Sequence, residues 1–254
     1  MAFNPGRFGR LNASGLGQTL VYRPATGSTN TVLKELAGAA PGTVVLADTQ
    51  SAGRGRLDRV WVDEPGKNLL FSVLDIRPVT DKKSGLIPLL TSLAIVRTIG
   101  DRVAGAGIKW PNDLVHDGRK LAGILVEART TGSTMAFIIG IGLNVNQVRF
   151  SVPGGVEPVS LALLTGHPED RERLLADLLM NLERVLQQEP VSDLLMAYRS
   201  ACVTTGQTIR FTHHGEEKVG FADSVDDEGR LVIQSEGHTL AYQGNEIFHI
   251  RVQP

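Results

Sequence analysis

Three short stretches of the chain combine residue types that can do chemistry, and the first is the segment QSAGRGR, Gln50–Arg56. Its glycines allow backbone N–H groups to approach an anion closely, and Arg54 and Arg56 can each make two-pronged contacts to phosphate or carboxylate. The pattern fits an anion-binding loop and a solvated basic turn equally well. It is not a dinucleotide-binding fingerprint, because Asp58 stands where that motif requires glycine.

The second stretch is KWPND, Lys109–Asp113, followed closely by RKLAGILVE with Lys120 near its start. Proline fixes the chain at a turn, which presents Asn112 and Asp113 at the end of a strand. Lys120 opens an apolar strand, from which its ammonium can point into a pocket. Pattern alone slightly favours a simpler explanation, an ordinary hairpin with exposed charges.

The third stretch is GIGLNVN, Gly140–Asn146. Glycines inside an apolar strand indicate a bulge, or a place where something packs directly on the backbone. Val145 occupies the third glycine position of a dinucleotide loop, so that reading is excluded. Asn144 and Asn146 follow the strand, and the pattern fits two roles for them, residues of a site or residues that form a turn. The chain also lacks the sequence GxxxxGK[ST], so ATP would not be held by a P-loop.

Composition and charge argue against several classes of protein, among them nucleic-acid-binding, disulfide-rich and membrane proteins. The chain has 254 residues and a net charge of −1, which suits one good-sized core and argues against the basic patch that nucleic acid requires. The single cysteine, Cys202, excludes an internal disulfide framework and is expected in the core. His213-His214 has no metal-ligand partners at suitable spacing and is expected on the surface. No bilayer-spanning run or signal-peptide core occurs, so we expect a cytoplasmic protein without membrane contact.

Apolar periodicity predicts the elements that must position these stretches. Helices are expected from Ser28 onward and over Leu86–Val103, Arg171–Gln188 and Val191–Arg199. Strands are expected at Gln18–Tyr22, Thr43–Ala47, Asn68–Leu74, Ile108–Trp110, Leu121–Val126 and Met135–Ile141. Beyond Val203 the chain changes to short strands with tight turns, typical of a small barrel. We therefore expect a first domain over residues 1–203, with 1–17 as a flexible tail, and a small β-domain over 204–254.

Taken in order, Ser28-Thr29-Asn30, QSAGRGR, KWPNDL, RKLAGILVE and GIGLNVN closely resemble the biotin–protein ligases. The resemblance is strong from about Ser28 to Asn146 and weaker toward the C-terminus. It implies an α+β fold, with a mixed sheet flanked by helices as in class II synthetases and lipoate ligases, followed by a small SH3-like β-barrel. It also implies formation of biotinyl-5'-AMP from biotin and ATP with Mg²⁺, then transfer to a lysine of a biotin carboxyl carrier protein, such as that of acetyl-CoA carboxylase.

The resemblance also implies roles for individual residues. Arg54, Arg56 and Lys120 match the catalytic cations. The positions that match contacts to biotin are Ser28, Thr29, Asn30, Gln50, Gly53, Arg54, Gly55, Arg56, Lys120, Gly123, Gly140 and Gly142. The positions that match the nucleotide end are Arg54, Trp61, Asn112, Asp113 and Asn144. Lys120, rather than Lys109, matches the lysine beside the activated carboxyl.

Two departures from the family pattern stand out. The loop continues as Leu57-Asp58-Arg59 where a second Gly-Arg pair is usual, which puts the details of its closure in doubt. Many relatives also carry an N-terminal helix-turn-helix domain, and the segment before Thr26 is too short for one, so we expect a ligase that does not bind DNA. A homodimer is left open.

Two other functions compete. A lipoate or octanoate ligase shares the fold but would be favoured by bulky residues at the glycine positions. A non-catalytic, adenylate-binding regulatory protein should have lost Arg54, Arg56 or Lys120, and all three are present.

Overall fold

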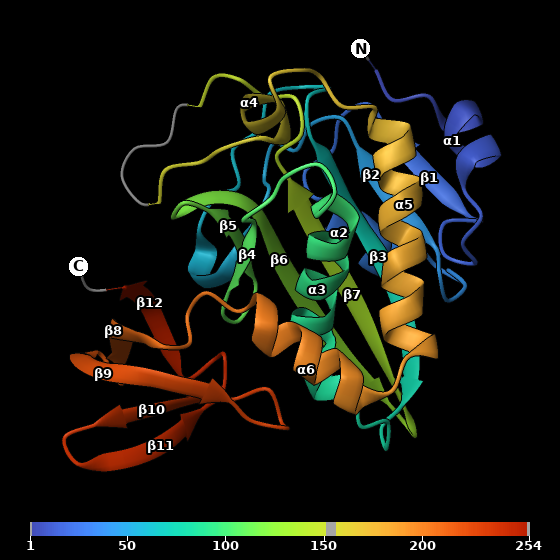
Figure 1. Ribbon diagram of the computed structural model, residues 1–254. Coiled ribbons are helices and arrows are strands. Elements are labelled where there is room, and N and C mark those ends of the chain that lie inside the picture. Colours follow the sequence, from blue (N-terminus) through green and yellow to red (C-terminus); the bar gives the residue numbers. More distant parts are fainter. Residues whose placement is uncertain (1, 151–155, 253–254) are drawn as a thin grey trace.

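The computed structural model describes residues 2–150 and 156–252. Its centre is a seven-stranded sheet in the order β1-β2-β3-β7-β6-β5-β4 (Figure 1). The strands are β1 (Leu20–Arg23), β2 (Val44–Ala47), β3 (Leu69–Pro78), β4 (Gly107–Lys109), β5 (Asp113–His116), β6 (Arg119–Thr131) and β7 (Thr134–Leu143). Only β1 and β2 run parallel, and the other neighbours are antiparallel, so the sheet is mixed as expected.

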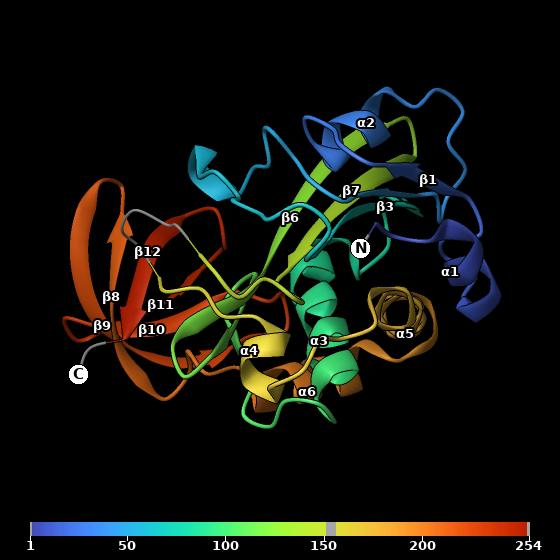
Figure 2. The same cartoon turned by 90° about the horizontal axis from the view of Figure 1, so that it is seen from above.

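Helices cover both faces of this sheet. Successive residues of its central strands point to opposite sides, and both sets are apolar, so each face needs a covering layer. Val44 and Val73 face the main core, whereas their neighbours Val45 and Leu74 pack with Leu33 in a second cluster. Leu33 belongs to α2 (Thr29–Glu35), which lies alone on its side of the sheet (Figure 2). The opposite face is covered by α3 (Ile87–Ile99), α5 (Arg171–Glu183) and α6 (Val191–Ala201). Shorter elements are α4 (Leu161–Thr165), the 3-10 turns η1 (Arg56–Asp58) and η2 (Ser84–Leu86), and the π-turn η3 (Arg184–Gln188).

The N-terminal segment is folded, so the expected flexible tail over residues 1–17 is wrong for the part that the structure describes. It forms α1 (Pro5–Leu11), which Asn4 caps by accepting from the N–H of Arg7. Phe3 and Phe8 are buried, and apolar side chains of that size stabilise a docked segment by about 1.5–3 kcal/mol each. The two aromatic rings provide the apolar surface that orders a segment otherwise rich in glycine and polar residues.

The C-terminal part is a five-stranded antiparallel sheet in the order β11-β10-β9-β8-β12. Its strands are β8 (Gln207–His213), β9 (Glu216–Val225), β10 (Leu231–Ser235), β11 (His238–Tyr242) and β12 (Ile247–Val252). Bulges in the β9–β10 and β8–β12 pairs help it to curve. Among the described strands β11 and β12 do not pair, so the curved sheet fits an SH3-like domain without closing into a barrel. Trp110 joins it to the main core by donating to the carbonyl of Gly229.

Cys202 and the pair His213-His214, to which the sequence assigned no chemistry, lie where expected. Cys202 is buried. His213 and His214 stack at the β8–β9 turn with ring centroids 4.0 Å apart. Within the described ranges no three His, Cys, Asp or Glu side chains are grouped to hold a metal ion. In the same ranges, none of the helices is both long and apolar enough to cross a membrane.

Candidate active site

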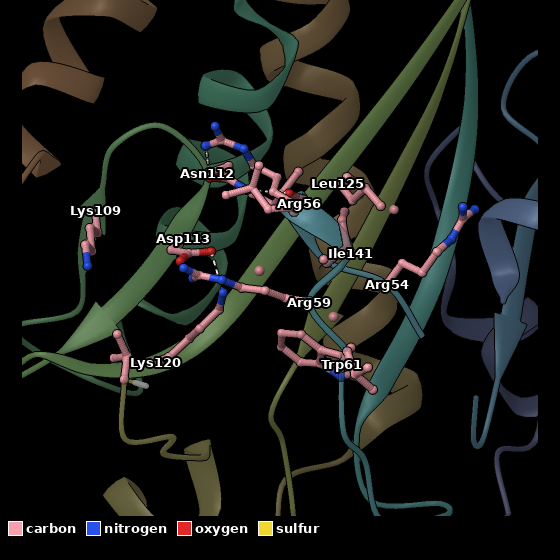
Figure 3. Close-up of a pocket in the computed structure, with 18 of the residues that line it drawn as sticks. Arg54, Arg56, Arg59, Trp61, Lys109, Asn112, Asp113, Lys120, Leu125 and Ile141 are labelled. Carbon is pink, nitrogen blue, oxygen red and sulfur yellow. Dashed lines mark hydrogen bonds and ion pairs between the residues drawn. The ribbon is translucent and has the colours of Figure 1, made fainter. Parts of the chain in front are cut away.

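A cavity of about 630 Å³ lies between the central sheet, the loop that joins β2 to β3, and the start of β12. Figure 3 shows part of its lining, which comes from the loop on one side and from strands β4 to β7 on the other. All the predicted site residues except Gly53 line this cavity. Segments far apart in the sequence therefore line a single cavity.

Gly53 lies behind the cavity wall. Its carbonyl accepts from the N–H of Trp61 at 2.9 Å, which ties the two arms of the loop together. A Cβ at position 53 would lie 3.0 Å from the Trp61 carbonyl oxygen, so glycine allows this close approach. The structure thus gives Gly53 a role in shaping the loop, where the sequence predicted a contact to the ligand.

One end of the cavity is formed by the first turn of α2 and by Gln50. The N–H of Thr29 donates to Gln50 Oε1 at 2.8 Å, and Ser28, Thr29 and Asn30 are all buried. The N–H of Gln50 in turn donates to Asp63 Oδ1 at 3.2 Å, so the loop's second arm supports this end. Burial and internal hydrogen bonds leave these polar groups with few alternative orientations, which suits recognition of a small polar ring.

The glycines of β6 and β7 are covered by side chains of the protein itself. The indole of Trp61 lies on Gly142, where a Cβ would come within 2.7 Å of Trp61 Cε2, and on Gly123, where the gap would be 3.0 Å. At Gly140 a Cβ would collide with Asn30 Oδ1. Of the two explanations that the sequence left open for these glycines, the contacts fit close packing on the backbone. In this structure, however, Trp61 and Asn30 occupy the surface on which the sequence placed a ligand ring.

The arginines of the loop point to different ends of the cavity. Arg54 extends away from the other cations, and its Nη2 lies 3.9 Å from the carboxylate of Glu127 (Figure 3). Arg56 instead donates to Asn112 Oδ1 at 3.2 Å and to the carbonyl of Gly244, next to the ring of Phe248. Burial lowers the pKa of Arg56, although nearby Asp113 opposes that shift.

Cations gather around one carboxylate at the other end. Lys120 Nζ lies 2.6 Å from Asp113 Oδ1, while Lys109 also lines the cavity and has its pKa lowered by burial. Arg59 and Arg251 add further positive charge. This surplus suits a polyanion such as a triphosphate, whose charges would replace the internal pairing.

Two buried polar atoms at the cavity have no hydrogen-bond partner among the described residues, Asn144 Oδ1 and Trp61 Nε1. Asn144 is held in place by donating from Nδ2 to the carbonyls of Lys120 and Val159. Buried polar groups are nearly always paired in folded proteins, so an unpaired acceptor and donor at a cavity wall favour a ligand that pairs with them. Asn144 and Trp61 were both predicted at the nucleotide end.

Sequence reasoning missed several residues of the cavity. Lys109 was passed over in favour of Lys120, although it stands inside the KWPND motif and its charge was a usable signal. Phe248 and Arg251 come from β12, and nothing in a short strand of mixed residues indicates that it reaches a site built by the other sheet. The side chain of Asp58, the departure from the family loop, lies outside what the structure describes.

Comparison with known proteins agrees with this geometry. Residues 22–144 match the Biotin/lipoate A/B protein ligase family. The chain is 34% identical over 240 residues to the biotin--[acetyl-CoA-carboxylase] ligase of Mycobacterium tuberculosis, across 89% of this chain and 87% of that one. It is 33% identical over 241 residues to the bifunctional ligase/repressor BirA of Bacillus spizizenii, across 91% of this chain and 73% of the relative.

A solved structure has the same fold. The biotin protein ligase from Aquifex aeolicus in complex with biotin and ATP superposes with a TM-score of 0.78. The match covers 93% of this chain and 100% of that one at 24% sequence identity. Both sheets of the present chain therefore have counterparts in a known protein.

Proposed function

The chain belongs to the biotin–protein ligase family, and from that premise we propose that it makes biotinyl-5'-AMP from biotin and ATP and transfers biotin to a lysine of a carrier protein. The carrier would be a biotin carboxyl carrier domain such as that of acetyl-CoA carboxylase, and the reaction would take place in the cytoplasm. One observation carries the proposal. Buried polar groups at one end of a single cavity, Ser28–Asn30 with Gln50, face a cluster of cations at the other end.

The chemistry of adenylation suits these side chains. Attack of the biotin carboxylate on the α-phosphorus of ATP joins two anions, forms a C–O–P linkage and releases pyrophosphate. Catalysis is then mainly neutralisation of charge and in-line positioning, which Arg54, Arg56 and Lys120 can supply. In the second step a carrier lysine amine attacks the mixed anhydride and AMP leaves. A loop folded over the site would protect that anhydride from water.

The residues at the nucleotide end fit a magnesium ion that arrives with the triphosphate. Asp113 is the one carboxylate among the described residues that line the cavity, and Asn112 beside it offers an amide oxygen. Mg²⁺ typically takes one or two such oxygens and completes its shell with phosphate and water. When bound, the ion would neutralise charge on the transferring phosphate, and Asp113 and Asn112 would hold it.

The competing functions fit less well. A lipoate or octanoate ligase has no need for the buried polar end formed by Thr29, Asn30 and Gln50, because its acyl chains carry no polar ring. A regulatory protein that only bound an adenylate would not need Lys120 in the cavity. The ligase reading accounts for both features.

The proposal is tested by incubating the protein with ATP, Mg²⁺, labelled biotin and a purified carrier domain. Label should enter the carrier only when ATP and biotin are both present, and biotinyl-adenylate should accumulate when the carrier is omitted. Lipoate and octanoate serve as rival substrates, and transfer of either in preference to biotin would overturn the assignment. Light scattering on the same preparation separates a monomer from a homodimer.

Arg54→Ala should weaken retention of the adenylate and slow its synthesis. In this structure Arg54 faces Glu127, so its contact to the phosphate would form when the loop folds over the adenylate. Losing that charge-assisted contact should cost on the order of 1.5–3 kcal/mol. Trapping the adenylate on a desalting column and following its release measures the effect. Wild-type formation and release rates in this variant would exclude Arg54 from the mechanism.

Gly142→Val should lower biotin affinity while leaving the fold intact. The new side chain would occupy the surface that the Trp61 indole now covers, so a biotin ring bound there would be overpacked against this wall of the cavity. A loss of about 10- to 100-fold, from about 1–3 kcal/mol of overpacking, is expected by calorimetry. Gly85→Val is the matched control, because a Cβ there meets no atom within 4 Å. Equal biotin affinities for the two variants would contradict the prediction.

A further inference from the structure

A chain of hydrogen bonds runs behind the buried polar end of the cavity. Asn30 Nδ2 donates to Glu127 Oε2 at 2.8 Å, and Asn30 Oδ1 lies 2.6 Å from Ser72 Oγ. Ser72 Oγ also lies 2.7 Å from Thr29 Oγ1. Ser72 on β3 is completely buried, and neither it nor Glu127 on β6 lines the cavity.

The direction of each bond follows from Glu127. An ionised carboxylate can only accept, so it selects the orientation of Asn30 in which the NH₂ group faces β6. Asn30 Oδ1 must then accept, which uses the single proton of Ser72. The hydroxyl of Thr29 then donates either to Ser72 Oγ, 2.7 Å away, or to Gln50 Oε1, 3.1 Å away, and its single proton is used in both cases. Thr29 therefore keeps only lone pairs for a ligand, and its backbone N–H holds Gln50 Oε1, which leaves Gln50 Nε2 as a donor.

The carboxylate is itself held in place and kept charged. Lys34 Nζ lies 2.5 Å from Glu127 Oε1, on the side away from Asn30. Burial acts to raise the pKa of Glu127, but hydrogen bonds from Lys34 and Asn30 outweigh it and leave the pKa lowered. Arg54, 3.9 Å away, adds positive charge on the cavity side.

We propose that Glu127 and Ser72 are positioning residues that fix which polar atoms at this end of the cavity donate and which accept. The inference rests on the proposed function, because the ligand whose recognition it explains is the cyclic urea of biotin. A cyclic urea has two N–H donors and one carbonyl acceptor, so it needs fixed acceptors and a fixed donor opposite it. Apart from Glu127, the Asn30 NH₂ group donates to the Leu125 carbonyl at the longer distance of 3.4 Å. Without Glu127 the amide is therefore held less firmly, and the pattern that matches the urea is no longer fixed.

The test is a comparison of Glu127→Gln and Ser72→Ala in steady-state adenylation. Each should raise the KM for biotin about 10-fold, with kcat and the KM for ATP unchanged, which is the signature of lost ground-state binding. Because the two residues act through the same amide, their effects should not multiply. The double variant should stay near the 10-fold increase of the single ones, well below the roughly 100-fold expected for independent sites.

Two controls separate this role from a purely structural one. Lys34→Ala removes the ion pair that holds the carboxylate but leaves its hydrogen bond to Asn30, so the KM for biotin should rise less than in Glu127→Gln. Glu189→Gln removes a half-buried carboxylate paired with Arg97 outside the cavity and should have no effect on KM. A fall in kcat together with a rise in the KM for ATP in Glu127→Gln would indicate general damage and overturn the proposal.

Failure of the inference is distinguishable from failure of the proposed function. If the wild-type protein neither binds nor adenylates biotin, the proposed function falls, and the inference falls with it. If the wild type is active but Glu127→Gln keeps the wild-type KM for biotin, only the inference is overturned. Multiplying effects in the double variant would also overturn it, because they would show that Glu127 and Ser72 act separately.

Discussion

Lys120→Ala is expected to slow biotin adenylation by about 10²- to 10³-fold, the range found when one preorganised donor to a developing charge is removed. Lys120 Nζ lies in the cavity beside Asp113, so an arriving triphosphate can take over its charge. Charge on the transferring phosphate is largest in the transition state, and the loss should therefore fall on the chemical step. Rapid-quench single-turnover experiments measure that step, and calorimetry measures biotin binding separately, which should change little.

Three variants make the Lys120 result specific. Lys120→Arg should not restore the rate, because a planar guanidinium replaces a compact ammonium. Lys67→Ala removes an exposed lysine that pairs with Glu64 outside the cavity, and it should behave as wild type. Lys109→Ala removes the other lysine of the cavity and should be milder than Lys120→Ala. If Lys109→Ala is the more damaged variant, the assignment of the catalytic lysine is wrong.

Arg171→Met is expected to destabilise the protein by about 3–5 kcal/mol, because it would leave a buried carboxylate without its counter-ion. Arg171 at the start of α5 is only 6% exposed, and its Nη1 donates to Asp48 Oδ1 at 2.9 Å and to the carbonyl of Asn68. Asp48 also accepts from Tyr22 and from the N–H of Phe3. Urea unfolding followed by two spectroscopic probes gives the change in the free energy of unfolding.

The matched control is on the same helix. Arg173 pairs with Asp177, but its side chain is 59% exposed, so Arg173→Met should cost no more than about 0.5 kcal/mol. Replacing both buried charges, with Asp48→Asn added to Arg171→Met, should recover part of the lost stability. Equal midpoints for Arg171→Met and Arg173→Met would show that the buried pair contributes nothing.

Much of the fold could be predicted because local periodicity and burial agree. The apolar spacing in Leu86–Val103 gives α3, and the two apolar runs around Gly132 give the long β6–β7 hairpin. The N-terminal segment could not be predicted in the same way. Its order depends on Phe3 and Phe8 finding a partner surface on α5, and the sequence of the segment contains no sign of that distant surface.

The same distinction applies to the site, where some residues could be predicted from local sequence and others could not. Residue types and order predicted the loop arginines, Lys120 and the glycines, since each carries a chemical property that can be read locally. What covers each glycine could not be predicted, because Trp61 reaches Gly142 only after the loop folds back across the sheet. The same holds for Glu127, whose importance comes from a hydrogen bond to Asn30 across 97 positions of sequence.

The placement of Trp61 makes it an intrinsic fluorescence probe of the site. The chain has two tryptophans, and Trp110 is fixed in the core by its bond to Gly229. Trp61 lies on the loop with its Nε1 unbonded among the described residues, so its emission is sensitive to whatever displaces it from Gly142. Stopped-flow fluorescence can therefore time the displacement of Trp61 by a ligand without an attached dye, and a Trp61→Phe protein shows what Trp110 alone contributes. The change in Trp61 emission then reports when the indole leaves Gly142.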